Sequence, residues 1–184
     1  LTNNAASNAA SVSSFGRFVA FSSPATNLVS DDTNNASDIF LRDRQTAQTT
    51  RISVASNGQQ GNGNSTNPRI SSDGRYVTFS SAASNLVSGD TNNATDIFVR
   101  DLQLGVTFRI PGSGVGNGSA DYSAISDDGN YVAFQSSASD LVSGDTNMAQ
   151  DVFVAQRSAF APAVIPPTSS EGCGCTPVTI TKTA

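Results

Sequence analysis

The sequence predicts an all-β protein made of β-propeller blades, as three four-stranded repeats of about 55–58 residues. Three observations lead to this prediction. One pattern of residues recurs three times in register. Each copy divides into four short strand-like segments, and none keeps the i, i+3, i+4 spacing of an amphipathic helix. The inner segments of each copy carry apolar residues on both faces.

The repeat is defined by two landmarks that keep the same spacing. The first is a glycine followed by an apolar segment, at Gly16, Gly74 and Gly129. The second is the aspartate of a D-T-N triplet, at Asp32, Asp90 and Asp145. Both landmarks recur after 58 and then 55 residues, so the copies share one internal register. The difference in length lies between the first D-T-N loop and the second glycine.

Four strands are expected in each copy, and the middle copy illustrates them. The first strand is expected at residues 68–71 ("PRIS") and the second at 75–80 ("RYVTFS"), joined by a D-G turn that suits a hairpin. A loop with the D-T-N triplet leads to the third strand at 96–101 ("DIFVRD"). The fourth strand is expected at 106–110 ("VTFRI").

The inner strands have two apolar faces. Val77 and Phe79 point to one side of the second strand, and Tyr76 and Thr78 point to the other. The third strand has the same character. Strands that are apolar on both faces fit small sheets stacked against one another, as blades are around a propeller axis.

The middle copy, residues 67–110, resembles the TolB-like β-propeller repeat of bacterial periplasmic and secreted proteins. It contains the P-x-(I/L)-S-x-D-G-(R/K)-x-(I/V)-(A/T)-F run and the D-(I/V)-(F/Y)-V-x-D run of that repeat. The similarity extends over about residues 5–156. The first copy departs from the pattern at Phe15, and the third departs at Ala155 and Gln156. The resemblance implies a propeller fold and an exported protein.

The predicted blades span approximately residues 1–54, 55–111 and 112–157. A propeller normally has 4–8 blades. The chain is therefore a fragment of a longer propeller, or pairs with a second copy to make six blades, or forms an open arc. An open arc would expose apolar blade faces. We therefore expect further blades, from the same parent protein or from another copy in a homo-oligomer.

Residues 158–184 form a tail outside the repeats. It begins as a Pro-rich linker and ends in the alternating segment "TPVTITKT", which reads as a strand. That strand supplies a fourth strand to the third blade or pairs with a neighbour. Cys173 and Cys175 form a C-G-C motif. Its alternatives are a strained disulfide, an intermolecular bridge or half of a soft-metal site, and an exported protein favours a bridge.

Composition excludes several functional classes. The net charge is −5 with no basic run, which argues against a nucleic-acid partner. The absence of histidine removes the Ser-His-Asp and Cys-His nucleophile systems. No apolar run approaches the ~20 residues of a membrane span. Only 14% of residues are charged, and the polar, uncharged surface resembles that of secreted bacterial proteins. We expect a secreted, periplasmic or cell-surface location.

Repeated oxygen side chains make each D-T-N loop a candidate calcium site, since calcium takes 6–8 oxygen ligands. The candidate ligands are Asp32, Asn34, Asp38, Asp90, Asn92, Asp96, Asp145, Asn147 and Asp151. The spacing D-x-N-x-x-x-D begins like an EF-type loop but has Ala94 where that loop has its fifth-position ligand. The alternative is that these side chains only cap turns and bond nearby backbone N–H groups.

The function predicted from the sequence is that of a non-enzymatic, exported propeller module for protein–protein interaction or surface assembly, with one structural calcium ion in each blade. Two alternatives remain open at this point. The chain could be the accessory propeller domain of a larger secreted hydrolase, or a propeller that binds carbohydrate through its loops.

Overall fold

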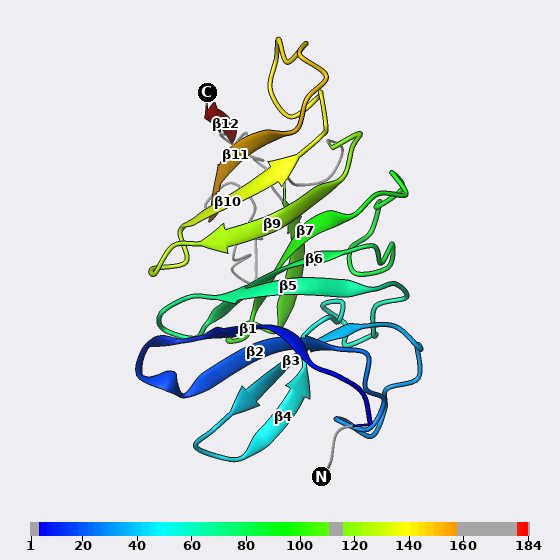
Figure 1. Cartoon of the computed structure of the whole chain (residues 1–184), viewed down its shortest axis with the longest axis vertical. Helices are drawn as coiled ribbons and strands as arrows, with labels where there is room; N and C mark the ends of the chain where they lie inside the picture. Colours follow the sequence, from blue (N-terminus) through cyan, green and yellow to red (C-terminus); the bar gives the residue numbers. More distant parts are fainter. Residues whose placement is uncertain (1–3, 111–115, 158–179, 184) are drawn as a thin grey trace, which may run out of the picture.

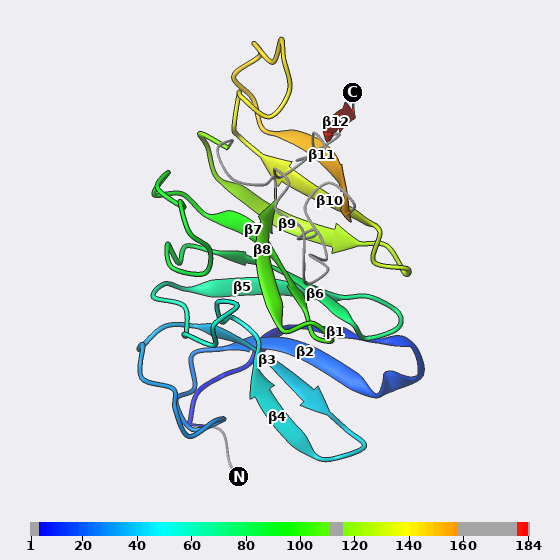
Figure 2. The same ribbon diagram turned by 180° about the vertical axis from the view of Figure 1, so that it is seen from behind.

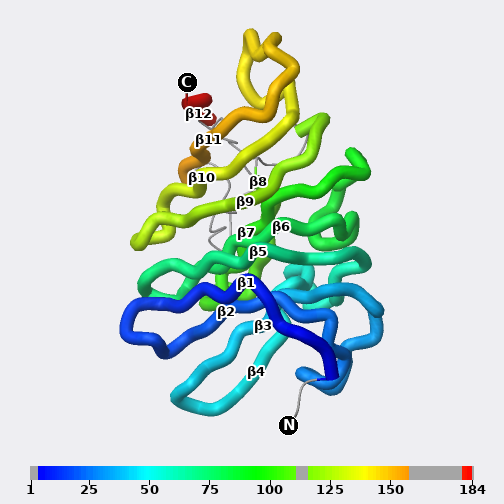
Figure 3. Tube along the Cα trace, viewed as in Figure 1, coloured from blue at the N-terminus to red at the C-terminus, as the bar shows by residue number. Residues whose placement is uncertain are grey.

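The described residues of the computed structural model are 4–110, 116–157 and 180–183. They form three four-stranded sheets, stacked one on another in chain order (Figures 1 and 3). Apart from one 3-10 turn, η1 (Ser14–Gly16), the named elements are all strands. Within the described ranges, no helical segment has the length and hydropathy needed to span a membrane. The prediction of an all-β protein made of four-stranded repeats is confirmed.

Neighbouring strands in each sheet are antiparallel, and the order follows the chain. The first sheet contains β1 (Asn8–Val12), β2 (Phe18–Ser23), β3 (Asp38–Asp43) and β4 (Gln48–Arg51). The second contains β5 (Ser65–Ile70), β6 (Tyr76–Ser81), β7 (Asp96–Asp101) and β8 (Val106–Ile110). The third contains β9 (Ala120–Ile125), β10 (Tyr131–Ser136), β11 (Asp151–Gln156) and β12 (Ile180–Thr183). β1, β5 and β9 lie one above another in Figure 1, and Figure 2 shows β8 on the opposite side of the stack.

The strand β12 comes from the tail. It pairs antiparallel with β11, opposite residues 152–155, and so forms the fourth strand of the third sheet. The sequence left two positions open for this segment, in the third blade or against a neighbour, and the structure places it in the third blade. The predicted bridge at Cys173 and Cys175 lies outside the described residues.

The first strand of each sheet begins before the segment that the sequence predicts, because it continues through a β-bulge. In β5 the pairing with β6 shifts register between Thr66 and Arg69. Asn67, inside the shift, has a φ of 52°. The equivalent bulge residues Ala9 and Tyr122 also have positive φ. Asparagine is enriched at positive φ, but alanine and tyrosine are not, so the residue types at this position do not together signal a bulge.

The core lies between the sheets. Between the first and second sheets it contains Ala20, Ile39, Leu41, Ile70, Val77, Phe79 and Phe98. Between the second and third sheets it contains Tyr76, Ile97, Val99, Ile110, Val132, Phe134 and Phe153. β6 is buried along its whole length, because its alternate residues belong to the two different clusters. The predicted burial of both faces is thus confirmed for the middle sheet.

A pair of phenylalanines on β2 and β3, or on their equivalents, marks the centre of each sheet. The pairs are Phe21–Phe40, Phe79–Phe98 and Phe134–Phe153, each with ring centroids 5.8 Å apart. Such aromatic pairs contribute about 0.5–1.5 kcal/mol beyond the burial of their area. In the second and third sheets this pair faces the sheet that precedes it in the chain.

An aromatic ring seated on a glycine fixes how closely the sheets approach. The ring of Phe18 lies on Gly74 of the next sheet, and the ring of Tyr76 lies on Gly129. A Cβ atom at Gly74 would lie 2.5 Å from Cδ2 of Phe18. The guanidinium of Arg157 closes the second site, because it lies 4.6 Å from the Tyr76 ring centroid and donates to the hydroxyl at 2.8 Å.

A ladder of backbone hydrogen bonds connects the β1–β2 turn to its equivalents in the other sheets. The N–H of Ser14 donates to the carbonyl of Ser72 at 2.9 Å, and the N–H of Ser72 donates to the carbonyl of Asp127 at 3.1 Å. One junction therefore repeats the other in its backbone bonds as well as in its side chains.

Replacing Gly129 by alanine tests the aromatic–glycine contact. The new Cβ would collide with the Tyr76 ring, and overpacking of this kind costs about 1–3 kcal/mol. Gly144→Ala is the matched control, because its φ of +83° is also left-handed but nothing lies within 4 Å of the added atom. Urea unfolding should show a larger loss of stability for Gly129→Ala. Equal losses would mean that the sheets do not meet at this glycine.

Candidate functional site

The long loops that carry the D-T-N triplets lie along one edge of the stack, called here the long-loop edge. They connect the second and third strands of each sheet, at residues 24–37, 82–95 and 137–150. Figure 1 shows these loops at the right and top of the molecule, while the short turns between the first and second strands lie at the left. The candidate site residues are therefore repeated along one side.

In the middle sheet the predicted ligands meet a basic side chain. The Nη1 atom of Arg109, on β8, lies 3.0 Å from a carboxylate oxygen of Asp90 and 3.3 Å from one of Asp96. The three side chains are at most 5% exposed. The amide of Asn92 donates to Asp96 at 3.1 Å and to the carbonyl of Gly116, before the next sheet, at 2.8 Å. The cluster thus joins loop, strand and neighbouring sheet.

The first sheet contains the equivalent cluster around Arg51. Its guanidinium lies 3.1 Å from Asp31, 3.4 Å from Asp32 and 4.0 Å from Asp38. Asp38 also accepts hydrogen bonds from the Ser53 hydroxyl at 2.5 Å and from Asn34 at 2.9 Å. Asp32 is also buried, and its 3.4 Å contact with Arg51 is longer than the 3.0 Å contact between Asp90 and Arg109, so the pairing is looser than in the middle sheet.

In the third sheet a lysine takes the place of the arginine. Nζ of Lys182 lies 3.0 Å from Asp145 and 2.7 Å from Asp151. Asn147 donates to Asp151 at 3.4 Å. Lys182 is the only lysine of the chain, and it reaches this loop because β12 completes the sheet.

The three basic residues occupy one register position. Arg51, Arg109 and Lys182 are paired with Phe40, Phe98 and Phe153 respectively. The repeated D-T-N pattern identifies the surrounding carboxylates but not these cations. The basic residue is the middle one of three aligned fourth-strand segments, "TRI", "FRI" and "TKT". The third segment can be aligned with the other two only when the tail is known to form the fourth strand of the third sheet.

Burial and charge act in opposite directions on the carboxylates. Burial raises the pKa of Asp96 to about 6, against the lowering effects of Arg109 and Asn92. Burial likewise raises the pKa of Asp38, although Ser53 and Asn34 oppose it. The hydrogen bond from Lys182 instead lowers the pKa of Asp151. The equivalent residues Asp96 and Asp151 therefore have pKa values shifted in opposite directions.

The structure brings Asp90, Asn92 and Asp96 together, as the calcium hypothesis requires, and their counterparts are arranged similarly. Each acidic pair already contacts a side-chain cation, so a calcium ion would have to displace or share that cation. Among the described residues there is no group of three or more Asp, Glu, His or Cys side chains placed to hold a metal. Calcium binding at these loops stays a prediction.

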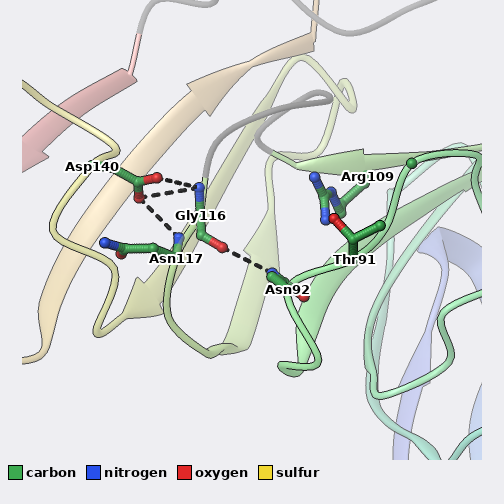
Figure 4. Close-up of a pocket in the computed structure, with 7 residues that line it drawn as sticks. Thr91, Asn92, Arg109, Gly116, Asn117 and Asp140 are labelled. Carbon is green, nitrogen blue, oxygen red and sulfur yellow. Dashed lines mark hydrogen bonds between the residues drawn. The ribbon is translucent and has the colours of Figure 1, made fainter.

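A polar hollow of about 200 Å³ lies beside the middle cluster, where the loop meets the next sheet (Figure 4). Arg109, Asn92 and Thr91 line one side, and Gly116, Asn117 and Asp140 line the other. Asp140 accepts the N–H groups of Gly116 and Asn117, at 3.1 and 2.9 Å. The residues that line the hollow form hydrogen bonds with one another across the boundary between the second and third sheets. These bonds hold the two sheets together.

Stacked four-stranded antiparallel sheets with a shared core define the protein as a set of consecutive β-propeller blades. No protein-family model matches the sequence, and no curated protein matches it either. Solved structures do match the fold.

A putative TolB from Agrobacterium tumefaciens matches with a TM-score of 0.55 at 19% identity, over 84% of this chain and 47% of that one. TolB from Acinetobacter baumannii matches with a TM-score of 0.52 at 18% identity, over 85% of this chain and 31% of that one. The tricorn protease matches with a TM-score of 0.53 at 18% identity, over 82% of this chain and 13% of that one. The chain has the fold of TolB-like propeller blades and spans less than half the length of each of these proteins.

Removing the central cation of the middle cluster tests its structural role. In Arg109→Met, Asp90 and Asp96 remain buried without a counter-charge, which costs about 3–5 kcal/mol in comparable pairs. Arg17→Met is the control, because it breaks an exposed pair with Asp43 and should lose much less stability. Urea unfolding would contradict this account if the two variants lost similar stability.

The same Arg109→Met variant tests the calcium hypothesis. If the loop can hold calcium, millimolar calcium should raise the melting temperature of the variant more than that of the wild type, since the competing guanidinium is gone. No rise in either protein would count against calcium at this loop.

The pKa of Asp96 predicts a distinctive pH dependence. Its folded pKa of about 6 exceeds an unfolded value of about 3.9, so the folded chain binds this proton more tightly. Its contribution to the free energy of unfolding is therefore largest below about pH 4 and falls by about 2 kcal/mol as the pH rises through 6.

Unfolding of Asp96→Asn and wild type between pH 4 and 7 measures this contribution. The wild type should lose stability relative to the variant as the pH rises. Asp151→Asn is the control, because Lys182 lowers the pKa of Asp151, so its contribution is lost only below about pH 4 and should stay nearly constant between pH 4 and 7. A pH-independent difference for Asp96→Asn would refute the raised pKa.

Proposed function

We propose that the chain forms part of an exported β-propeller that binds a protein partner through its long-loop edge. The observation that carries the proposal is the repetition of one exposed loop in all three sheets. The equivalent threonines Thr33, Thr91 and Thr146 are exposed in each copy. The residues two positions later, Asn35, Asn93 and Met148, are also exposed and have φ values of 53–54°.

The clusters beneath these loops favour a preformed binding surface. Arg109 and its counterparts connect each loop to the fourth strand of its own sheet, and Asn92 connects the middle loop to the next sheet. A surface held in place before binding loses less conformational entropy when a partner docks. Met148, which is 99% exposed, gives the edge a flexible apolar contact of the kind enriched at protein interfaces.

A binding role fits the chemistry of the chain better than a catalytic one. The sequence has no histidine, and the buried carboxylates of the loops are paired with Arg51, Arg109 and Lys182. Such pairs hold charge in place and do not present a free acid or base to a substrate. The predicted calcium ions are not required for this role, because the side-chain cations already balance the carboxylates.

Export is supported by the composition and by the resemblance to repeats of periplasmic and secreted proteins. A second candidate, the accessory propeller of a larger secreted hydrolase, is favoured by the likeness of the fold to part of the tricorn protease. In that role the partner would be a hydrolase domain of the same parent protein. Carbohydrate binding stays a prediction from the sequence.

The proposal is tested by retention of protein partners from an extract of the source organism. The loop variant replaces Thr91, Asn93 and Met148 by glutamate, which leaves the buried clusters intact. The control replaces Gln45, Gln103 and Leu104 by glutamate, at the exposed β3–β4 turn and the β7–β8 turn. A partner retained by wild type and control but lost by the loop variant would support the proposal, and calorimetry with the purified partner would give its affinity. Equal retention by all three proteins would reject the long-loop edge.

A further inference from the structure

Three asparagine–glycine pairs occur in the chain, at Asn57–Gly58, Asn62–Gly63 and Asn117–Gly118. In such a pair the backbone nitrogen of the glycine can attack Cγ of the asparagine, because no Cβ atom hinders the approach. The attack forms the N–Cγ bond of a succinimide ring and breaks the Cγ–Nδ2 bond, and the backbone proton leaves with Nδ2 as ammonia. Water then opens the ring to aspartate or isoaspartate. Local structure determines which pair can reach this geometry.

The side chain of Asn62 is held at both ends of its amide. Its Oδ1 accepts the N–H of Ser84 at 2.9 Å, and its Nδ2 donates to the hydroxyl of Ser84 at 3.0 Å. The glycine that follows is also tightly packed, because a Cβ atom at Gly63 would lie 2.7 Å from the carbonyl oxygen of Ala82. Attack on Asn62 therefore requires this segment to separate from the long loop of the second sheet.

Asn117 is held in the same way in the third sheet. Its Oδ1 accepts the N–H of Ser139 at 2.9 Å, and its Nδ2 donates to the hydroxyl of Ser139 at 3.0 Å. A Cβ atom at Gly118 would lie 2.7 Å from the backbone nitrogen of Ala138. Asn62 and Asn117 occupy one repeat position, so the fold of the blade restrains both of them.

Asn57 belongs to a small hairpin that is not part of the repeat. The connection from Ile52 to Gly61 is three residues longer than its counterpart from Ile110 to Gly116. An antiparallel bridge between Val54 and Gln60 closes the hairpin. The contacts that restrain the two repeated asparagines therefore do not extend to Asn57.

The tip of this hairpin is exposed. Asn57 and Gly58 both face solvent, and among the described residues nothing lies within 4 Å of a Cβ atom added at Gly58. Oδ1 of Asn57 accepts the N–H of Gln59 at 3.0 Å, and the N–H of Gly58 donates to the carbonyl of Ala55 at 2.9 Å. Both bonds lie within the tip, so only the tip has to rearrange for the glycine nitrogen to reach Cγ.

We propose that Asn57 is a site of spontaneous deamidation, which converts it to aspartate or isoaspartate in the native protein while Asn62 and Asn117 are preserved. Water is the only co-reactant, and ammonia is the only other product. This inference goes beyond the proposed function, because it requires no partner and does not involve the D-T-N loops.

The product would change the contact between this hairpin and the second sheet. Ser56, next to Asn57, accepts the N–H of Thr107 on β8 at 2.9 Å. Isoaspartate adds a methylene group to the backbone after residue 57 and so displaces the hairpin that positions Ser56. Asn57 also lines a hollow of about 590 Å³ whose described lining residues carry no charge, and deamidation would place a carboxylate there.

Peptide mapping by mass spectrometry follows all three sites in one sample. The pure chain is incubated at neutral pH, native and unfolded in guanidinium chloride. The unfolded chain should deamidate at similar rates at the three pairs. In the native chain Asn57 should react about tenfold or more faster than Asn62 and Asn117, because each of those must first break two side-chain hydrogen bonds. A native rate at Asn57 no higher than at the other two would overturn the proposal.

Asn57→Gln is the matched variant, because attack on glutamine would have to close a larger and less favoured ring. It should stay unmodified at this position while the other two pairs behave as in the wild type. After the same incubation, the N–H of Thr107 should exchange with solvent faster in the wild type than in the variant, as measured by NMR. Equal exchange in the two incubated proteins would overturn the proposed effect on the hairpin contact.

Discussion

A four-stranded sheet with apolar side chains on both faces is stable only where both faces are covered, and this constraint governs the molecule. β6 meets it fully, because Val77 and Phe79 pack against the first sheet while Tyr76 packs against the third. The distance between sheets is set where an aromatic ring meets a glycine that has no Cβ. Because every sheet carries the same two faces, the stack has a direction, and its two outer faces differ in shape and chemistry.

The long loops depend on the same stacking for their geometry. Asn92 reaches a carbonyl of the next sheet, so the loop of one blade is held by the blade that follows it. Arg109 then holds the loop from the side of its own fourth strand. A charged cluster of this kind is costly to bury unless its members are paired, which explains why each acidic loop is matched by one basic residue on the fourth strand. The middle loop is therefore held in place both by its own sheet and by the next one.

Much of the fold could be predicted from the sequence, because repetition in register fixes both strand position and strand face. The third strands begin and end where "DIFVRD" and its relatives predict. The bulges could not be predicted from residue type, since Ala9 and Tyr122 belong to types that rarely adopt a positive φ and only Asn67 belongs to a type enriched there. The candidate carboxylates can be predicted because they repeat, whereas Lys182 cannot, because a long segment separates it from its blade. Long-range pairing of that kind leaves no trace in local composition.

Proton NMR of the native chain tests the stacking of blades most directly. One Hα proton of Gly129 points toward Cδ2 of the Tyr76 ring, so the ring current should move it away from its random-coil shift and it should show nuclear Overhauser effects to the ring protons. Gly74 should show the same effects with Phe18, and Gly144, with no atom near its added Cβ, should show neither. Random-coil shifts and no contacts at Gly74 and Gly129 would contradict the account of sheets held together at these glycines.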